Sequence, residues 1–307
     1  MMNTDELTKK ILLLLEKFQR RYKKECDHKN TTDCLLVHSN KIMNFIQNNL
    51  PIHFILPAFP AKSPNTKKTE GPHPDLGERL SLIFLNALCN QIKEIYSAGA
   101  SICICSDGRV FSDLVNVSDE KVNVYSAGIK KIISDEALVF LHTFDLDDYY
   151  QLLSNDERRK RLSIEYAENI ESLKNRLHTE EFSKRLFNGM HRFVFEDYCA
   201  LFNEYSKNKL KKVSKKITYQ LIQRSNAWSR LLSERFPHSV RLSIHPQHCG
   251  SEKLGIMLLS SDQVWATPWH RVVLKSQDVI RLVSKQDAIA LGATRILQNN
   301  MFSHYEA

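Results

Sequence analysis

Residues 100–106, with the sequence ASICICS, decide the fold class, because they form a continuous apolar run that stops at Asp107 and Gly108. Such a run is typical of a central strand that is covered on both faces. A second apolar run, IHFIL at residues 52–56, lies upstream, and a helical pattern that starts near Asp75 connects the two. Two strands joined through a helix form a parallel βαβ unit. The sequence therefore predicts an α/β protein with a Rossmann-like, mostly parallel sheet flanked by helices.

The remaining patterns extend this unit in both directions. Helices are expected at residues 4–26, 33–47, 154–236 and 287–298. Further short strands are expected at residues 122–125, 137–144, 240–244, 254–259 and 272–275. We therefore divide the chain into an N-terminal helical segment (1–48), a Rossmann-like catalytic domain with a helical middle section (49–250) and a small C-terminal α+β subdomain (251–307).

The composition is that of an ordinary globular protein, with 42% hydrophobic and 25% charged residues among 307. No apolar run approaches the ~20 residues that a membrane span needs, and no export signal is evident, so we expect a cytoplasmic protein without a membrane partner. The net charge of +8 suits anionic small substrates. The lysine-rich run at residues 207–216 lacks the aromatic residues of a nucleic-acid reader, so we interpret it as a solvated helix face and expect no nucleic acid.

Polar side chains gather where the predicted strands end, which is the edge at which open α/β sheets bind ligands. The proline-rich loop at residues 57–74 follows the first strand and carries Lys62, Ser63 and Asn65, which together suit an anion. An alternative interpretation is a stiffened surface loop whose lysines are solvated.

The segment after the second strand carries Asp107, Arg109 and Asp113. Asp107 is a candidate general base, and Arg109 is a candidate clamp for a phosphate or carboxylate. The alternative is a plain Asp-Gly turn with a surface ion pair.

Two later segments add aromatic and imidazole groups. Arg224 and Trp228 stand four residues apart on a predicted helix, where they suit the carboxylate and ring of an aromatic substrate. His245 ends a predicted strand, and Trp269 precedes His270, a candidate proton carrier. The alternatives are a core tryptophan and structural histidines.

Neither a metal nor a cofactor is expected. Cys26, His28, Cys34 and His38 lie close in sequence, but their spacing is not a usual zinc pattern. The chain has no P-loop, no G-x-G-x-x-G and no H-E-x-x-H motif. The odd number of scattered cysteines, seven in all, favours a reduced, disulfide-free protein.

Several long motifs resemble the pyoverdine/dityrosine biosynthesis family, which includes bacterial isocyanide (isonitrile) synthases. The motifs are ILPAFPAKSPN (55–65), GPHPDLGE (71–78), SDGRVFSDLV (106–115), RSNAWSRLL (224–232), VRLSIHP (240–246) and TPWH (267–270). The resemblance extends from about residue 50 to about residue 275.

The resemblance implies a reaction in which the amine of an aromatic L-amino acid, tyrosine in preference to tryptophan, becomes an isonitrile. Ribulose 5-phosphate supplies the carbon, and no redox cofactor or metal takes part. A phosphate cradle would use Lys62, Arg79 and Arg109. Proton transfers would use Asp107, Asp113, His245 and His270. The amino-acid carboxylate would bind Arg224 or Arg241, and its side chain would contact Phe59, Phe111, Trp228 or Trp269.

Other functions stay open at this stage. The dityrosine branch of the family suggests an enzyme that forms N-formyl-tyrosine. A non-catalytic relative that binds a phosphosugar or a nucleic acid is a different class of protein. Within the leading hypothesis, the partners are the two small-molecule substrates and a downstream oxygenase of the same pathway.

Overall fold

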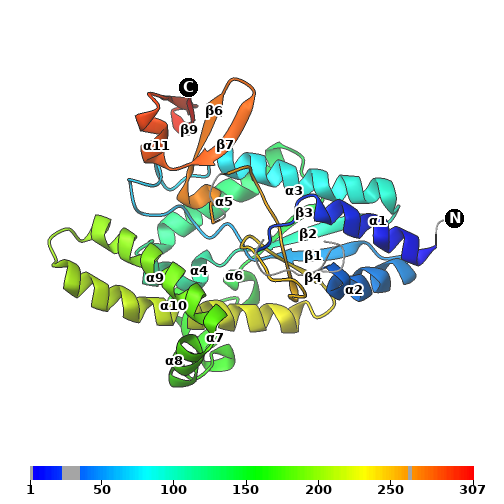
Figure 1. The fold of residues 1–307 in the computed structure, drawn as a ribbon, viewed down its shortest axis with the longest axis horizontal. Helices are drawn as coiled ribbons and strands as arrows, with labels where there is room; N and C mark the ends of the chain where they lie inside the picture. The colour runs from blue at the N-terminus through cyan, green and yellow to red at the C-terminus, as the bar shows by residue number, and fades with distance from the viewer. Residues whose placement is uncertain (1–2, 23–34, 262–264) are drawn as a thin grey trace.

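The centre of the protein is a five-stranded parallel sheet with the strand order β3-β2-β1-β4-β5 (Figure 1). The structure is a computed structural model and describes residues 3–22, 35–261 and 265–307. The strands are β1 (Ile52–Leu56), β2 (Ala100–Cys105), β3 (Leu141–Phe144), β4 (Val240–Ser243) and β5 (Lys253–Gly255). The chain winds outward from β1 to β3 and then returns to the other side of β1, so the strand order reverses between β1 and β4. The predicted Rossmann-like α/β class is confirmed.

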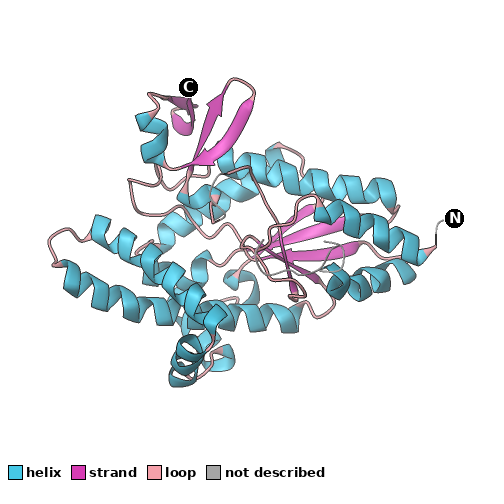
Figure 2. Ribbon diagram, viewed as in Figure 1, coloured by secondary structure: helices cyan, strands magenta, loops and turns pink. Residues whose placement is uncertain are grey.

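Helices flank the sheet because successive strand residues point to opposite faces (Figure 2). Phe54 and Leu56 of β1 belong to one hydrophobic core, whereas Ile55 belongs to another. The first core includes α1 (Thr4–Glu16), α2 (Leu36–Gln47), α3 (Leu76–Ile95) and α5 (Asp119–Asp135). The second core includes α7 (Asn155–Tyr166) and α10 (Lys207–Arg235).

The rest of the chain adds a helical section and a small second sheet. The helical section contains α7, α8 (Ile170–Thr179), α9 (Glu181–Leu201) and α10, as predicted for residues 154–236, and the short α6 (Leu146–Tyr149) before it was not predicted. The second sheet has the order β7-β6-β9-β8. It consists of β6 (Val272–Ser276), β7 (Val279–Val283), β8 (Thr294–Gln298) and β9 (Met301–Glu306), with α11 (Lys285–Ala290) between β7 and β8.

Three predicted elements are wrong. Residues 122–125 are helical, because Val122, Tyr125 and Ile129 form one buried stripe of α5. The helix expected at 287–298 ends at Ala290, because Gly292 adopts a positive φ of 71° and turns the chain into β8. The helix expected at 4–26 ends at Glu16, and the part of it beyond residue 22 lies outside the described residues. Cys26, His28 and Cys34 of the candidate metal cluster also lie outside them.

Two further findings concern the chain's organisation. β5 joins the main sheet instead of the small C-terminal sheet, and α1 shares the core of β1. The boundaries after residues 48 and 250 therefore stay a prediction.

Cys249 is disulfide-bonded, which contradicts the expectation of a disulfide-free protein, while Cys89, Cys103, Cys105 and Cys199 are free.

A buried ion cluster joins the loop at residues 57–74 to the start of α3. Lys62 Nζ lies 2.6 Å from Asp75 Oδ2 and 2.8 Å from Glu78 Oε2, and it donates to Pro268 O at 3.0 Å. Asp75 also caps α3 by accepting the Gly77 N–H at 2.8 Å. Burial and the neighbouring Glu78 raise the pKa of Asp75 to about 8. Three acceptors thus occupy the three donors of the Lys62 ammonium.

We expect Lys62→Met to lower the free energy of unfolding by about 3–5 kcal/mol, because it leaves two buried acids without their cation. Urea unfolding measures this change. Lys67→Met, at an exposed position in the same loop, should change stability by less than about 0.5 kcal/mol. A Lys62→Met protein as stable as the wild type would show that the cluster contributes nothing to the fold.

Candidate functional site

A cavity of about 740 Å³ lies at the carboxyl ends of β1, β2 and β4, beside the point where the strand order reverses. The loop after β1 lines it from Pro57 to Pro64, and the end of β4 lines it through Ser243 and His245. Helices α9 and α10 and the short η3 (Pro268–His270) line it as well, together with the segment after β2 and Lys253 of β5. Ligands bind at this position in open α/β sheets. The polar segments that follow these three strands all contribute residues to the cavity wall.

Asp107 lies on the cavity wall at the end of β2, and its carboxyl is buried. Within the described part of the chain, Asp107 Oδ1 has no hydrogen-bond partner, and burial raises the pKa of Asp107 to about 7. The neighbouring Gly108 explains this burial. A Cβ atom at Gly108 would lie 2.0 Å from Pro60 O, so only glycine lets the loop pack directly against the strand end. The site therefore holds a carboxyl that exchanges protons near neutral pH.

Two imidazoles line the same cavity. The His270 ring packs edge-on against Phe193 at 4.3 Å between centroids, and its Nδ1 lies 3.0 Å from Thr267 Oγ1. Burial, with Lys68 and other nearby cations, keeps the pKa of His270 well below its ordinary value. The His245 ring is accessible from the cavity, yet loss of hydration, Arg20 and Lys253 lower its pKa to about 4. Both rings are thus neutral at pH 7.

Aromatic side chains form an apolar part of the cavity wall. Trp228 is 2% exposed and stacks on Phe144 at 5.8 Å, and its Nε1 has no partner among the described residues. Trp269 packs against Phe59 at 5.2 Å. Both tryptophans line the cavity, as expected for a pocket that receives an aromatic ring.

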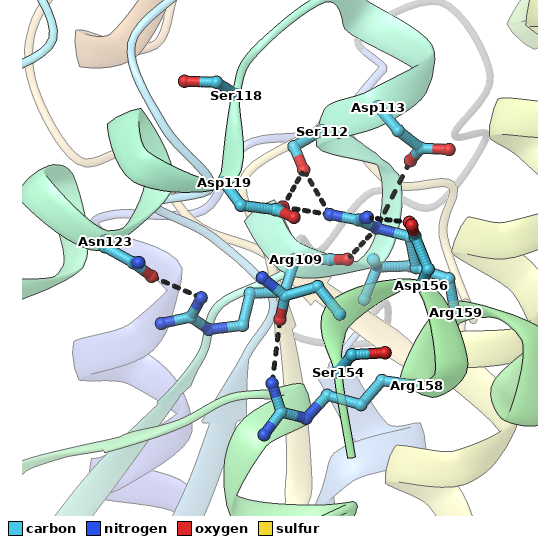
Figure 3. Close-up of polar contacts among 12 residues, drawn as sticks. Arg109, Ser112, Asp113, Ser118, Asp119, Asn123, Ser154, Asp156, Arg158 and Arg159 are labelled. Carbon is cyan, nitrogen blue, oxygen red and sulfur yellow. Dashed lines mark hydrogen bonds and ion pairs between the residues drawn. The ribbon is translucent and has the colours of Figure 1, made fainter.

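Several predicted site residues lie in ion-pair networks instead of on the cavity wall. Arg109 Nε is 2.9 Å from an Asp147 oxygen, and Arg109 Nη1 donates to Asn123 at 2.6 Å (Figure 3). Arg224 pairs with Asp113 at 2.6 Å, outside the residues that line the cavity. These contacts brace the turn after β2, together with Arg159, which donates to the Arg109 carbonyl and pairs with Asp119.

The other predicted residues have equally defined places. Arg79 of α3 pairs at 2.6 Å with Glu136, the residue that follows α5; its side chain is 45% exposed, and it is not among the residues that line the cavity. Ser63 lines the cavity, whereas Asn65 anchors Asp197 through a 2.9 Å hydrogen bond. Arg241 lies behind the wall and donates to Ser233 Oγ at 2.7 Å.

The sequence interpretation missed the contribution of α9 and of β5. Lys68 lies 2.7 Å from Asp197 of α9 and sits over the Phe193 ring at 3.9 Å. Lys253 of β5 lines the cavity, and burial and Arg241 lower its pKa to about 8. The sequences of α9 and β5 carry no recognisable motif, so only the tertiary fold reveals that these two elements belong to the site. The described residues hold no group of three or more metal-ligating side chains, and none of their helices is long and apolar enough to cross a membrane.

A parallel sheet with a cavity at its switch point, lined by titratable and aromatic side chains, is typical of α/β enzymes. The family model described as pyoverdine/dityrosine biosynthesis protein matches residues 42–295. L-tryptophan isonitrile synthase AmbI2 of Fischerella ambigua is 46% identical over 91% of this chain and 85% of its own length. L-tyrosine isonitrile synthase of Pseudomonas aeruginosa is 37% identical over 98% of this chain and 94% of its own length. The crystal structure of the P. aeruginosa PvcA protein superposes with a TM-score of 0.92 at 36% identity, covering 98% of this chain and 99% of that one.

The chain therefore belongs to the pyoverdine/dityrosine biosynthesis family, as its motifs indicated. It is an enzyme of the isonitrile (isocyanide) synthase class.

We expect the ionised Asp107 carboxyl to destabilise the fold. Because its folded pKa of about 7 lies above the ordinary value of 3.8, the folded state binds the proton more tightly than the unfolded state. Stability should then fall as the pH rises from about 4 to about 7. Asp107→Asn should raise the melting temperature at pH 8 and leave it unchanged below pH 4. If the variant and the wild type melted at the same temperature at pH 8 as well as below pH 4, the raised pKa of Asp107 would be contradicted.

Proposed function

We propose that this enzyme converts the amine of an aromatic L-amino acid into an isonitrile, with ribulose 5-phosphate as the carbon donor. The observation that carries the proposal is the Asp107 carboxyl, which titrates near neutral pH in the same cavity as the aromatic walls. The family and the named activities of the relatives support this choice of reaction.

The first step of the proposed reaction is the condensation of the amine with the C2 ketone of the sugar. A proton must leave the substrate ammonium, and another must reach the hydroxyl that departs as water. A carboxyl with a pKa of about 7 can perform both transfers at neutral pH. C2 then becomes the isonitrile carbon while the other sugar carbons depart. The rings of His245 and His270, which their lowered pKa values keep neutral, can accept hydrogen bonds from the substrates during this second stage.

The aromatic side chain of the substrate has two candidates. The motifs alone led us to favour tyrosine. The higher identity to the L-tryptophan enzyme, 46% against 37% for the L-tyrosine enzyme of P. aeruginosa, supports tryptophan as the first substrate to test. Trp228 and Trp269 on the cavity wall suit either ring.

The test is an incubation with each amino acid and ribulose 5-phosphate carrying carbon-13 at C2, followed by carbon-13 NMR. We expect the label in the isonitrile carbon of one product. Asp107→Asn should slow product formation by about 100-fold or more, the usual loss when a general acid–base group is removed. Asp135→Asn, an exposed acid of α5, is the matched control and should keep wild-type turnover. No labelled isonitrile from either amino acid would refute the proposed function.

A further inference from the structure

The cations around the cavity differ in whether a carboxylate neutralises them. Lys62 pairs with Asp75 and Glu78, and Lys68 lies 2.7 Å from Asp197. Arg109 and Arg224 also have carboxylate partners, at 2.9 Å and 2.6 Å. Each of these positive charges therefore has a carboxylate partner within the protein.

The wall formed by β4 and β5 is different. Arg241 and Lys253 are partners in the parallel ladder, so their side chains leave the same face of the sheet. Arg241 donates to the hydroxyls of Ser229 and Ser233. Both of its partners are uncharged, so neither neutralises the positive charge of the guanidinium.

Two more cations with uncharged partners contact the two ends of β4, Arg20 at the carboxyl end beside the cavity and Lys41 at the amino end. Arg20 Nη1 donates to Ile244 O at 2.7 Å, and Lys41 Nζ donates to Ser239 O at 3.0 Å. Within the described ranges, no carboxylate forms an ion pair with Arg20, Lys41, Arg241 or Lys253. The acid that faces them is Glu252, which is exposed to solvent.

Two groups of this wall reach the cavity as hydrogen-bond donors. Lys253 lines the cavity, and its ammonium has no hydrogen-bond partner among the residues that the structure describes. Ser243 Oγ accepts the His245 N–H and the Gln247 side-chain N–H, both at 3.1 Å. Its own hydroxyl proton therefore stays available to a ligand.

We propose that Lys253 and Ser243, backed by Arg20 and Arg241, form an oxyanion subsite that binds the phosphate or the carboxylate of a substrate. The identity of these two ligand groups rests on the proposed function. A buried cation without a counter-ion is unfavourable, and a bound oxyanion offsets that cost. The lowering of the Lys253 pKa to about 8 agrees with this uncompensated positive potential. This proposal differs from the phosphate cradle of Lys62, Arg79 and Arg109 that the resemblance implied.

Chemical protection tests the subsite without relying on turnover. Acetic anhydride modifies neutral amines, so Lys253 should react readily at pH 8, and peptide mass spectrometry reports the extent. At ten times its Kd, a ligand that covers the subsite should slow the acetylation of Lys253 about tenfold, because about one site in eleven stays free. The exposed Lys130 of α5 serves as the internal control and should react at an unchanged rate.

Separate arms identify the anion. Protection by ribulose 5-phosphate and by inorganic phosphate assigns the subsite to the phosphate, and protection by tryptophan or tyrosine assigns it to the carboxylate. Unchanged acetylation of Lys253 with every ligand overturns the proposal. Labelled isonitrile without protection would disprove the subsite alone, whereas protection without isonitrile would disprove the proposed function alone.

Substitution adds a kinetic readout. Lys253→Met should raise the KM of the substrate that protects Lys253 by roughly 10- to 100-fold, the value of a hydrogen bond to a charged group. Lys253→Arg keeps the charge and should restore most of the affinity, while Lys130→Met should behave as the wild type. If the Met and Arg variants instead lost the same amount of kcat and kept the wild-type KM, anion binding by Lys253 would be contradicted.

Discussion

The buried ion cluster of Lys62, Asp75 and Glu78 is the constraint on which the active cavity depends. It connects the loop after β1 and the start of α3 with a segment that lies 206 residues after Lys62, because Lys62 also donates to the carbonyl of Pro268. The adjacent Ser63 N–H donates to Trp269 O at 2.9 Å and completes this junction. The loop after β1 is thereby closed over the sheet edge, and η3 is held where Trp269 and His270 face the cavity. A lysine used in this way builds the wall and has no donor left for a ligand.

The same distinction applies to the arginines that follow β2. Arg109 and Arg159 brace the turn after Asp107 through partners on α5 and α7 (Figure 3). Their positions in recognisable motifs made Arg109 a reasonable candidate ligand. A guanidinium in a motif can equally serve the geometry of the site, because a precisely placed carboxyl such as Asp107 needs a rigid support. The partner of a charge, more than its place in a motif, separates the two roles.

Local patterns were sufficient for the parts of the fold that depend on neighbouring residues. The apolar runs of β1 and β2 and the capping box of Asp75 and Glu78 are read directly from the chain, and they locate the sheet edge that carries Asp107. The pairing of Lys62 with that capping box involves positions 13 and 16 residues away, and no periodicity encodes it. The placement of Lys253 beside Arg241 requires the order of β4 and β5 in the sheet, which is a tertiary property. The four-residue run at 122–125 was too short to separate a strand from one face of α5.

One physical cause, the loss of hydration in a confined cavity, shifts acids and bases toward their neutral forms. It raises the pKa of Asp107 to about 7 and lowers those of Lys253 and His245 to about 8 and about 4. In the proposed reaction the substrate amine must lose a proton before it can attack a ketone. The cations that face Lys253 act on a substrate ammonium in the same sense, because like charges disfavour protonation. A cavity that is short of carboxylates on the wall of β4 and β5 and holds the Asp107 carboxyl on another wall therefore favours the neutral amine and offers a group that can remove its proton.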